Sequence, residues 1–176
     1  MLLYLKRYYQ STRLLFRVAS VVVTLDQLTK YWVRRTLWPT QVWMPYDWLE
    51  PFFKIVHWKN SGASFGILED SGRLFAWLAS LAILTILVYY PRVPHTDGAL
   101  RWSLAFLMGG ITGNLIDRLH QGYVTDFISI GPTYVFNLAD VSNLTGVIII
   151  VWGMLLEERR KKKLATNIEP DPSETP

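Results

Sequence analysis

The stretch FNLADVSNLTGVIIIVWGMLL, residues 136–156, decides the fold class, because a short polar start leads into an apolar run as long as a bilayer is thick. A helix needs about 20 mostly apolar residues to cross the hydrocarbon core of a membrane. Three other windows meet this criterion, at about residues 14–33, 74–90 and 100–119. We therefore predict an all-α membrane protein with four transmembrane helices.

Charged residues crowd the gaps between these windows, in a chain of 176 residues with a formal net charge of +4. Lys and Arg gather near the N-terminus, in the connection 90–101 and in the run 159–163, whereas the loop 120–135 has neither. Since Lys and Arg are in excess on the cytoplasmic side, both termini are predicted to be cytoplasmic. Arg34 and Arg35 are exceptions, because they fall on the outer side.

The rest of the chain is organised around the helices as one predicted domain, residues 1–165. Residues 52–58, FFKIVHW, read as a strand bounded by turn residues. We therefore expect the extracytoplasmic segment, about 36–70, to form a small β-sheet or loop structure on the membrane surface. The tail 166–176 is rich in Pro, Glu and Ser, which predicts a disordered cytoplasmic tail.

Composition excludes several kinds of function. The chain has no Cys, which removes disulfides, thiolate metal sites and a Cys nucleophile. It has three His, no His-Glu-x-x-His motif and no Gly-x-Ser-x-Gly motif, so no metal and no cofactor are expected. A Ser64/Lys30 dyad is conceivable, but the many carboxylates at the outer helix ends argue against it. The basic run 159–163 follows an apolar helix and predicts an anchor on anionic membrane lipid rather than a nucleic-acid site.

Ionisable residues at membrane depth are costly, and they are candidates for function. Asp26 and Lys30 are four apart in the first helix, so they share a face and can form an ion pair. This pair either braces the helix bundle or belongs to an active site. In the motif NSGASFG, residues 60–66, Asn60 can grip a peptide backbone and Gly62 permits close approach. The motif alone is explained at least as well by an ordinary turn.

Small residues in GGITGNLIDR, residues 109–118, allow the third helix to pack closely against its neighbours. Asn114, Asp117 and Arg118 follow at the outer end of that helix. Asp117 is expected to be a paired, ionised carboxylate, with Arg118 or Lys30 as its partner.

Asp126 in VTDF and Asp140 in FNLAD are predicted to meet, because the third helix runs outward and the fourth runs back. Two adjacent carboxylates cannot both ionise cheaply, so the pair holds one proton. In an aspartic protease one such carboxylate takes a proton from water, while the other hydrogen-bonds the carbonyl under attack. Asp117 is the competing member of the pair, and Asp126 is preferred because Arg118 would keep Asp117 ionised.

In order and spacing, five motifs resemble those of the lipoprotein signal peptidases, or signal peptidase II: DQLTK (26–30), NSGASF (60–65), GNLIDR (113–118), VTDF (124–127) and FNLAD (136–140). The resemblance covers roughly residues 14–157. It implies a bacterial inner-membrane aspartic endopeptidase that removes the signal peptide of prolipoproteins, cutting before a diacylglyceryl-modified Cys. It places catalysis on Asp126 and Asp140. Substrate binding or ordering of the site would fall to Asn60, Gly62, Asn114, Arg118, Asn137, Asp26, Lys30 and Asp117.

The chain departs from the family pattern at Val141, where a small polar residue is usual, and at Thr125, where Val is common. The stretch from Asp126 to Asp140 also looks short, which suggests a trimmed hairpin. The expected partners are lipid-modified prolipoproteins and membrane lipids, with no nucleic acid. The alternative is a non-enzymatic membrane protein, such as a transporter subunit or assembly factor, that binds ions or protons. A conduction path needs polar residues at several depths, whereas here they gather at the outer helix ends.

Overall fold

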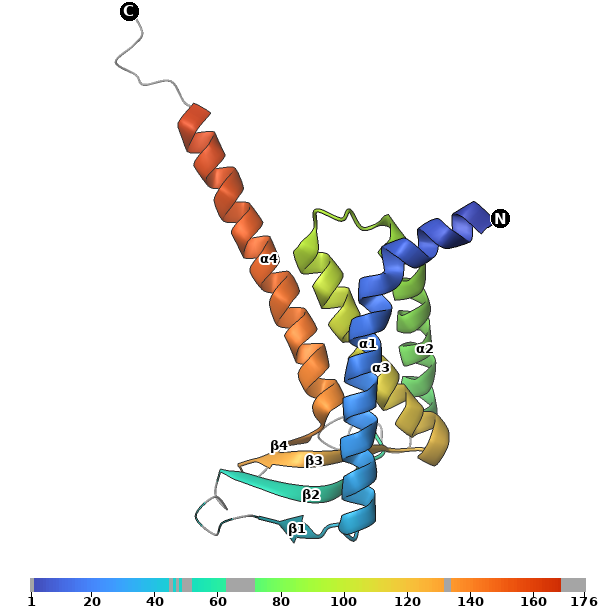
Figure 1. The fold of residues 1–176 in the computed structure, drawn as a ribbon. Helices are drawn as coiled ribbons and strands as arrows, with labels where there is room; N and C mark the ends of the chain where they lie inside the picture. The colour runs from blue at the N-terminus through green and yellow to red at the C-terminus, as the bar shows by residue number, and fades with distance from the viewer. Residues whose placement is uncertain are drawn as a thin grey trace, which may run out of the picture.

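The computed structural model describes residues 2–44, 46, 48, 52–62, 72–131 and 134–168. Its helices are α1 (Leu2–Thr36), α2 (Gly72–Tyr89), α3 (Gly98–Gln121) and α4 (Leu138–Ile168), with a short 3-10 turn, η3 (Tyr90–Arg92), after α2. The helices stand side by side, and a small sheet lies across one end of them (Figure 1). The start of α1 and the end of α4 both lie at the opposite end.

Each predicted helix is present, and α1 and α4 are longer than predicted. α1 starts at Leu2 rather than near residue 14, and α4 continues to Ile168 rather than ending near 156. The extension of α4 carries the ion pairs Glu157–Lys161 and Glu158–Lys162, at 2.9 and 2.7 Å, which support a helix at this spacing. Residues 166–168 are therefore helical rather than the start of a disordered tail, and residues 169–176 lie outside the described part.

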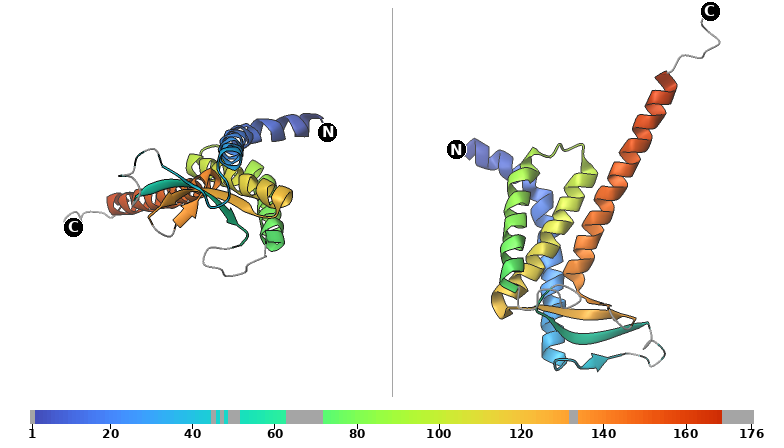
Figure 2. Two further views of the ribbon diagram at one scale, coloured as in Figure 1. Left: turned by 90° about the horizontal axis from the view of Figure 1, so that it is seen from below. Right: turned by 180° about the vertical axis from the view of Figure 1, so that it is seen from behind.

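The sheet has four antiparallel strands in sequence order, β1 (Val42–Trp43), β2 (Phe53–Asn60), β3 (Val124–Ile130) and β4 (Tyr134–Phe136). The strand predicted at 52–58 is β2. In its described residues the outer segment supplies β1 and β2, and the connection between α3 and α4 supplies the other two strands. β3, VTDFISI, is almost entirely buried, as its β-branched and aromatic residues favour. The views in Figure 2 show the strands extending to one side of the bundle, beneath α4.

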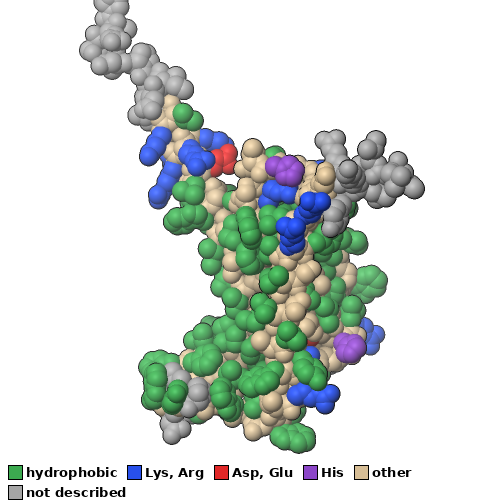
Figure 3. All heavy atoms as spheres, viewed as in Figure 1, with side chains coloured by type: hydrophobic (Ala, Val, Ile, Leu, Met, Phe, Trp, Pro, Cys, Tyr) green, Lys and Arg blue, Asp and Glu red, His purple; other side chains and the backbone are tan. Residues whose placement is uncertain are grey.

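Two of the helices are apolar and long enough to cross a membrane, among the residues described. They span Gly72–Arg92 and Leu138–Leu164, with mean hydropathy 1.9 and 1.7. Both expose large apolar side chains, such as Trp77 of α2 at 77% and Trp152 of α4 at 63%, and green apolar side chains cover the helices in Figure 3. α1 and α3 are less apolar, because both carry polar and charged residues within their predicted spans. Four spans therefore remain a prediction.

α3 is the central helix, because it packs against each of the other three. Close approach depends on its small residues. A Cβ added at Gly109 would lie 2.7 Å from the Val22 Cβ of α1, and one at Gly113 would lie 2.6 Å from Asp26 Oδ2. The polar outer end of α3 is thereby brought against α1, α4 and the sheet together.

Candidate active site

The first turn of α4 holds Asp140 in a fixed position. Asn137, just before the helix, accepts a hydrogen bond through Oδ1 from the Asp140 backbone N–H at 3.0 Å. Asp140 Oδ2 accepts one in return from the Asn137 backbone N–H at 3.2 Å. This reciprocal arrangement is a capping box, with Asp in the place of the usual Glu. Asp26 of α1 accepts the next free N–H, that of Ala139, at 3.0 Å.

Asp126 lies in β3, opposite Trp58 of β2, and is only 2% exposed. Both of its carboxyl oxygens accept hydrogen bonds from side-chain amides. Asn60 Nδ2 donates to Oδ2 at 2.9 Å, and Asn137 Nδ2 donates to Oδ1 at 2.6 Å. The carboxyl is therefore clamped between the end of β2 and the start of α4.

Two amide side chains connect Asp126 to Asp140. Asn137 binds Asp126 through its side chain and Asp140 through its backbone. Asn114 of α3 donates from Nδ2 to Asp140 Oδ1 at 2.8 Å and accepts from Asn137 Nδ2 at 3.1 Å. Asp126 is buried, whereas Asp140 is only partly buried, so solvent reaches the pair from the Asp140 side.

Burial raises the pKa of the Asp126 carboxyl to about 7, against the hydrogen bond from Asn60, which lowers it. The neighbouring charge of Asp140 acts in the same direction as burial, and the hydrogen bond from Asn137 opposes it. At neutral pH the Asp126 carboxyl is therefore divided between its protonated and ionised forms. A carboxyl with such a pKa beside a second carboxyl is suited to general acid–base catalysis.

A buried ion cluster lies beneath this pair. Lys30 is fully buried, and its ammonium contacts Asp26 Oδ2 at 2.9 Å, Asp117 Oδ2 at 3.2 Å and Asn114 Oδ1 at 2.9 Å. The predicted Asp26–Lys30 pair is therefore confirmed. The three contacts match the three donors of an ammonium group. Asn114 also donates to Asp140 Oδ1, so it connects the ammonium group to that carboxyl.

Asp117, the competing member of the predicted pair, faces α1 and β3. Its Oδ2 accepts from the Thr125 backbone N–H at 3.0 Å as well as from Lys30. Its Oδ1 accepts from Gln27 Nε2 at 3.3 Å and contacts Arg34 at 3.5 Å. Asp117 is therefore a paired carboxylate, as expected. Gln27 and Arg34 were not singled out from the sequence as contacts of Asp117. The signal for Arg34 was that it is a basic residue on the predicted outer side of the membrane, where Lys and Arg are disfavoured.

Of the two partners predicted for Asp117, Lys30 is confirmed, and the second cation in contact with it is Arg34 rather than Arg118. The Arg118 guanidinium lies over the Phe75 ring instead, 5.4 Å from its centre. Successive side chains on a helix point about 100° apart, so neighbours in sequence do not face a common partner. Arg118 is still within electrostatic range of Asp126 and Asp140.

Asn60 and Gly62 form a turn at the end of β2. The Gly62 N–H donates to Asn60 Oδ1 at 3.2 Å, while the other end of the same amide binds Asp126. Asn60 therefore forms a turn, as one interpretation of the motif expected, and its side chain also contacts the Asp126 carboxyl. Residues 63–66 of the motif lie outside the described residues.

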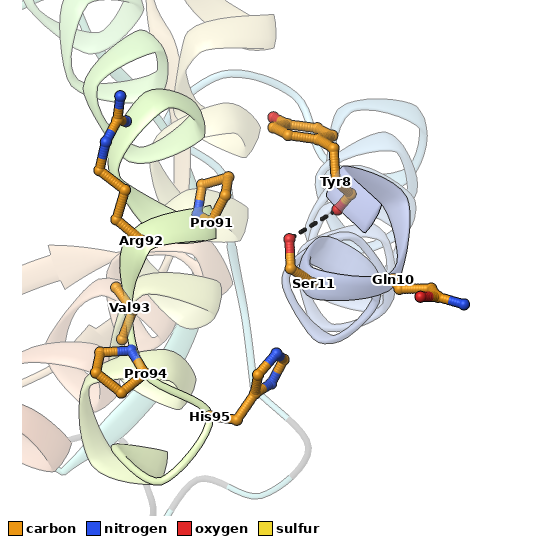
Figure 4. Close-up of a pocket in the computed structure, with 8 residues that line it drawn as sticks. All are labelled: Tyr8, Gln10, Ser11, Pro91, Arg92, Val93, Pro94 and His95. Carbon is orange, nitrogen blue, oxygen red and sulfur yellow. Dashed lines mark hydrogen bonds between the residues drawn. The ribbon is translucent and has the colours of Figure 1, made fainter. Parts of the chain in front are cut away.

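A separate cavity of about 620 Å³ lies at the other end of the bundle, where α1 passes the connection between α2 and α3 (Figure 4). Among the described residues that line it, none is Asp or Glu. The residues that line it are Tyr8, Gln10, Ser11, Pro91, Arg92, Val93, Pro94 and His95. In the parts of the chain that are described, no group of three or more His, Cys, Asp and Glu side chains is placed to hold a metal ion.

Comparison with known proteins relates the whole helical region to one family. The family model for signal peptidase (SPase) II matches residues 18–156. A lipoprotein signal peptidase of Moorella thermoacetica is 40% identical over 139 residues, covering 79% of this chain and 91% of the relative. One of Halalkalibacterium halodurans is 34% identical over 153 residues, covering 83% and 94%. A solved bacterial membrane enzyme superposes with a TM-score of 0.74 at 26% identity, covering 89% of this chain and 93% of that one.

Proposed function

The chain belongs to the signal peptidase II family, and we propose that Asp126 and Asp140 are the catalytic pair of an aspartic endopeptidase. The chain is a membrane protease that processes lipoprotein precursors, as its family does. A non-enzymatic role as a transporter subunit or assembly factor is not favoured by this membership. The observation that carries the proposal is that Asn137 hydrogen-bonds both carboxyl groups, so they lie on either side of one residue.

The proposed mechanism divides acid and base between the two carboxyl groups. Asp140, the more exposed, takes a proton from a water molecule, which attacks the scissile carbonyl carbon. Asp126, whose pKa is raised to about 7, carries the shared proton and donates a hydrogen bond to the carbonyl oxygen. When the tetrahedral intermediate breaks down, a proton passes to the leaving nitrogen and the pair returns to one shared proton. No metal takes part in this scheme.

The other site residues hold the pair or the substrate backbone. Asn60, Asn114 and Asn137 position the carboxyl groups through their amides. Asp26, Lys30 and Asp117 form the ion cluster beneath them. Gly62 and Arg118 border the site and are proposed to contact the substrate. The predicted cut lies before the diacylglyceryl-modified Cys of the prolipoprotein.

We place all four helices across the inner membrane of a bacterial cell, as one domain of residues 1–165, in contact with its lipids and without nucleic acid. Both termini are cytoplasmic in this arrangement. It is supported by the blue Lys and Arg side chains that gather at the end where α4 finishes, opposite the sheet (Figure 3). The carboxyl pair then lies at the extracytoplasmic surface, where a lipid-anchored Cys would be found.

The test is cleavage of a lipidated prolipoprotein by purified Asp126→Asn and Asp140→Asn variants. Asn keeps the shape of Asp but cannot exchange a proton. The kcat of each variant is therefore expected to fall by about a hundredfold to ten-thousandfold. Glu157→Gln, in an exposed ion pair of α4, is the control and should retain activity. Substantial turnover by Asp140→Asn, or inhibition by a chelator that zinc reverses, would overturn the aspartic mechanism.

A further inference from the structure

Arg34 is a basic residue on the predicted outer side of the membrane, where Lys and Arg are disfavoured, and its contacts account for its presence there. Its guanidinium donates to Thr125 Oγ1 at 3.1 Å and to Asp117 Oδ1 at 3.5 Å, with the side chain 26% exposed. The next residue, Arg35, is exposed and its guanidinium lies 5.3 Å from the centre of the Tyr31 ring. Two adjacent arginines therefore have different environments, and only Arg34 reaches the site.

Arg34 balances the charge of the buried cluster. Asp26 and Asp117 are 0% and 2% exposed, and they share the single ammonium of Lys30. Two carboxylates with one cation would leave one uncompensated negative charge beneath the catalytic pair. Arg34 supplies the second cation directly at Asp117. Buried charges are tolerated when they are paired in this way.

Arg34 also fixes the strand that carries Asp126. Thr125 is fully buried and precedes Asp126 in β3. Its backbone N–H binds Asp117, and its hydroxyl oxygen accepts from Arg34 and, at 3.0 Å, from Gln121 Nε2. Since successive strand residues point to opposite faces, anchoring Thr125 on one face aims Asp126 at Asn137 on the other.

We propose that Arg34 is a positioning residue for the Asp126/Asp140 pair, acting through Thr125 and Asp117. This inference rests on the proposed catalytic role of that pair. The Thr125 hydroxyl provides the acceptor for Arg34. Arg34 then has two separable effects, a hydrogen bond that orients β3 and a positive charge that offsets Asp117.

The charge has a definite consequence for pH dependence. A nearby cation favours an ionised carboxyl group, so removing the charge of Arg34 should raise the pH at which Asp126 loses its proton. The alkaline limb of the pH–activity curve, which follows Asp126, should then move to higher pH. The other charged or titratable groups around Asp126, from each element that packs near it, are Lys30 on α1, His57 and Lys59 on β2, Asp117 and Arg118 on α3, and Asp140 on α4.

The experiment measures kcat/KM against pH for Arg34→Gln, Arg34→Lys, Thr125→Val and the matched control Arg35→Gln, with a lipidated prolipoprotein as substrate. Arg34→Gln keeps a hydrogen-bond donor but loses the charge, and the alkaline limb should move to higher pH by about half a pH unit or more. Arg34→Lys keeps the positive charge, so its pH–activity curve should lie at the wild-type position. Thr125→Val keeps every charge, so its limbs should stay in place while kcat falls several-fold. Arg35→Gln should match the wild type.

Identical curves for Arg34→Gln and Arg35→Gln would overturn the proposal. If Arg34→Gln does not fold, Thr125→Val and Arg34→Lys decide, and wild-type kcat in Thr125→Val would refute the orienting role. Failure of the proposed function is recognised separately, as turnover by Asp126→Asn or Asp140→Asn. Suppose that those two changes inactivate the enzyme but that Arg34→Gln leaves the pH–activity curve unchanged. That result refutes only the role of Arg34.

Discussion

Asn137 Nδ2 lies 2.6 Å from Asp126 Oδ1, so the residue that caps α4 is also a direct hydrogen-bond donor to the proposed acid. One side chain therefore serves helix stability and catalysis, and the two contributions can be separated. The Oδ1 atom of Asn137 caps the helix, and its Nδ2 atom binds Asp126 and Asn114.

Asn137→Ser should therefore lose activity without losing stability. Ser is as good an N-cap as Asn, but its short hydroxyl does not replace the amide bridge to Asp126. We expect kcat to fall by roughly a hundredfold, as for other positioned groups, with a melting temperature close to that of the wild type. Asn137→Ala should lower both, with the lost cap costing about 1 kcal/mol. Equal activity of Asn137→Ser and the wild type would show that the hydrogen bond from Asn137 to Asp126 is not needed for catalysis.

The pH dependence of cleavage should follow the Asp126 carboxyl. Because its pKa is raised to about 7 and it must be protonated to donate to the carbonyl oxygen, activity should decline as the pH rises through that value. Asn60→Ala removes a hydrogen bond that favours the ionised form, so the Asp126 pKa should rise further and the alkaline limb should move to higher pH. A limb that moves to lower pH in Asn60→Ala would contradict this assignment.

Asp26→Asn is expected to act on stability as well as on activity. It leaves the fully buried Lys30 with one carboxylate fewer, and breaking a buried ion pair typically costs about 3–5 kcal/mol. We expect lower yield from the membrane and a lower melting temperature in detergent. Glu157→Gln, in an exposed pair, should change the free energy of unfolding by less than about 1 kcal/mol. Similar melting temperatures for the two variants would show that Lys30 finds another partner.

Reporter fusions test the proposed topology. A reporter joined after Asp70 should read outside the cytoplasm, and reporters after His95 and Asn167 should read inside. The reason is the excess of Lys and Arg on the side of the termini. An outside signal at Asn167 would require an odd number of membrane crossings by the four helices, or the opposite orientation.

The sequence by itself determined the four helices, because apolar runs and helical periodicity are local properties. The same holds for β2, whose pattern is bounded by turn residues, and for the Asp26–Lys30 pair, because a spacing of four places two side chains on one helical face. The motifs also placed Asp126 and Asp140 at the same end of the helices.

Only the tertiary structure decided which polar groups meet. Asp117 was expected to pair with Arg118 or Lys30, and the structure shows Lys30 together with Arg34, which the sequence did not suggest as a partner. β3 pairs with β2, which comes from the distant outer segment, so its place in the sheet was not visible in the local pattern. Partner choice depends on the angle and contact distance at which helices and strands pack, and these follow from close contacts such as that of Gly113 with Asp26.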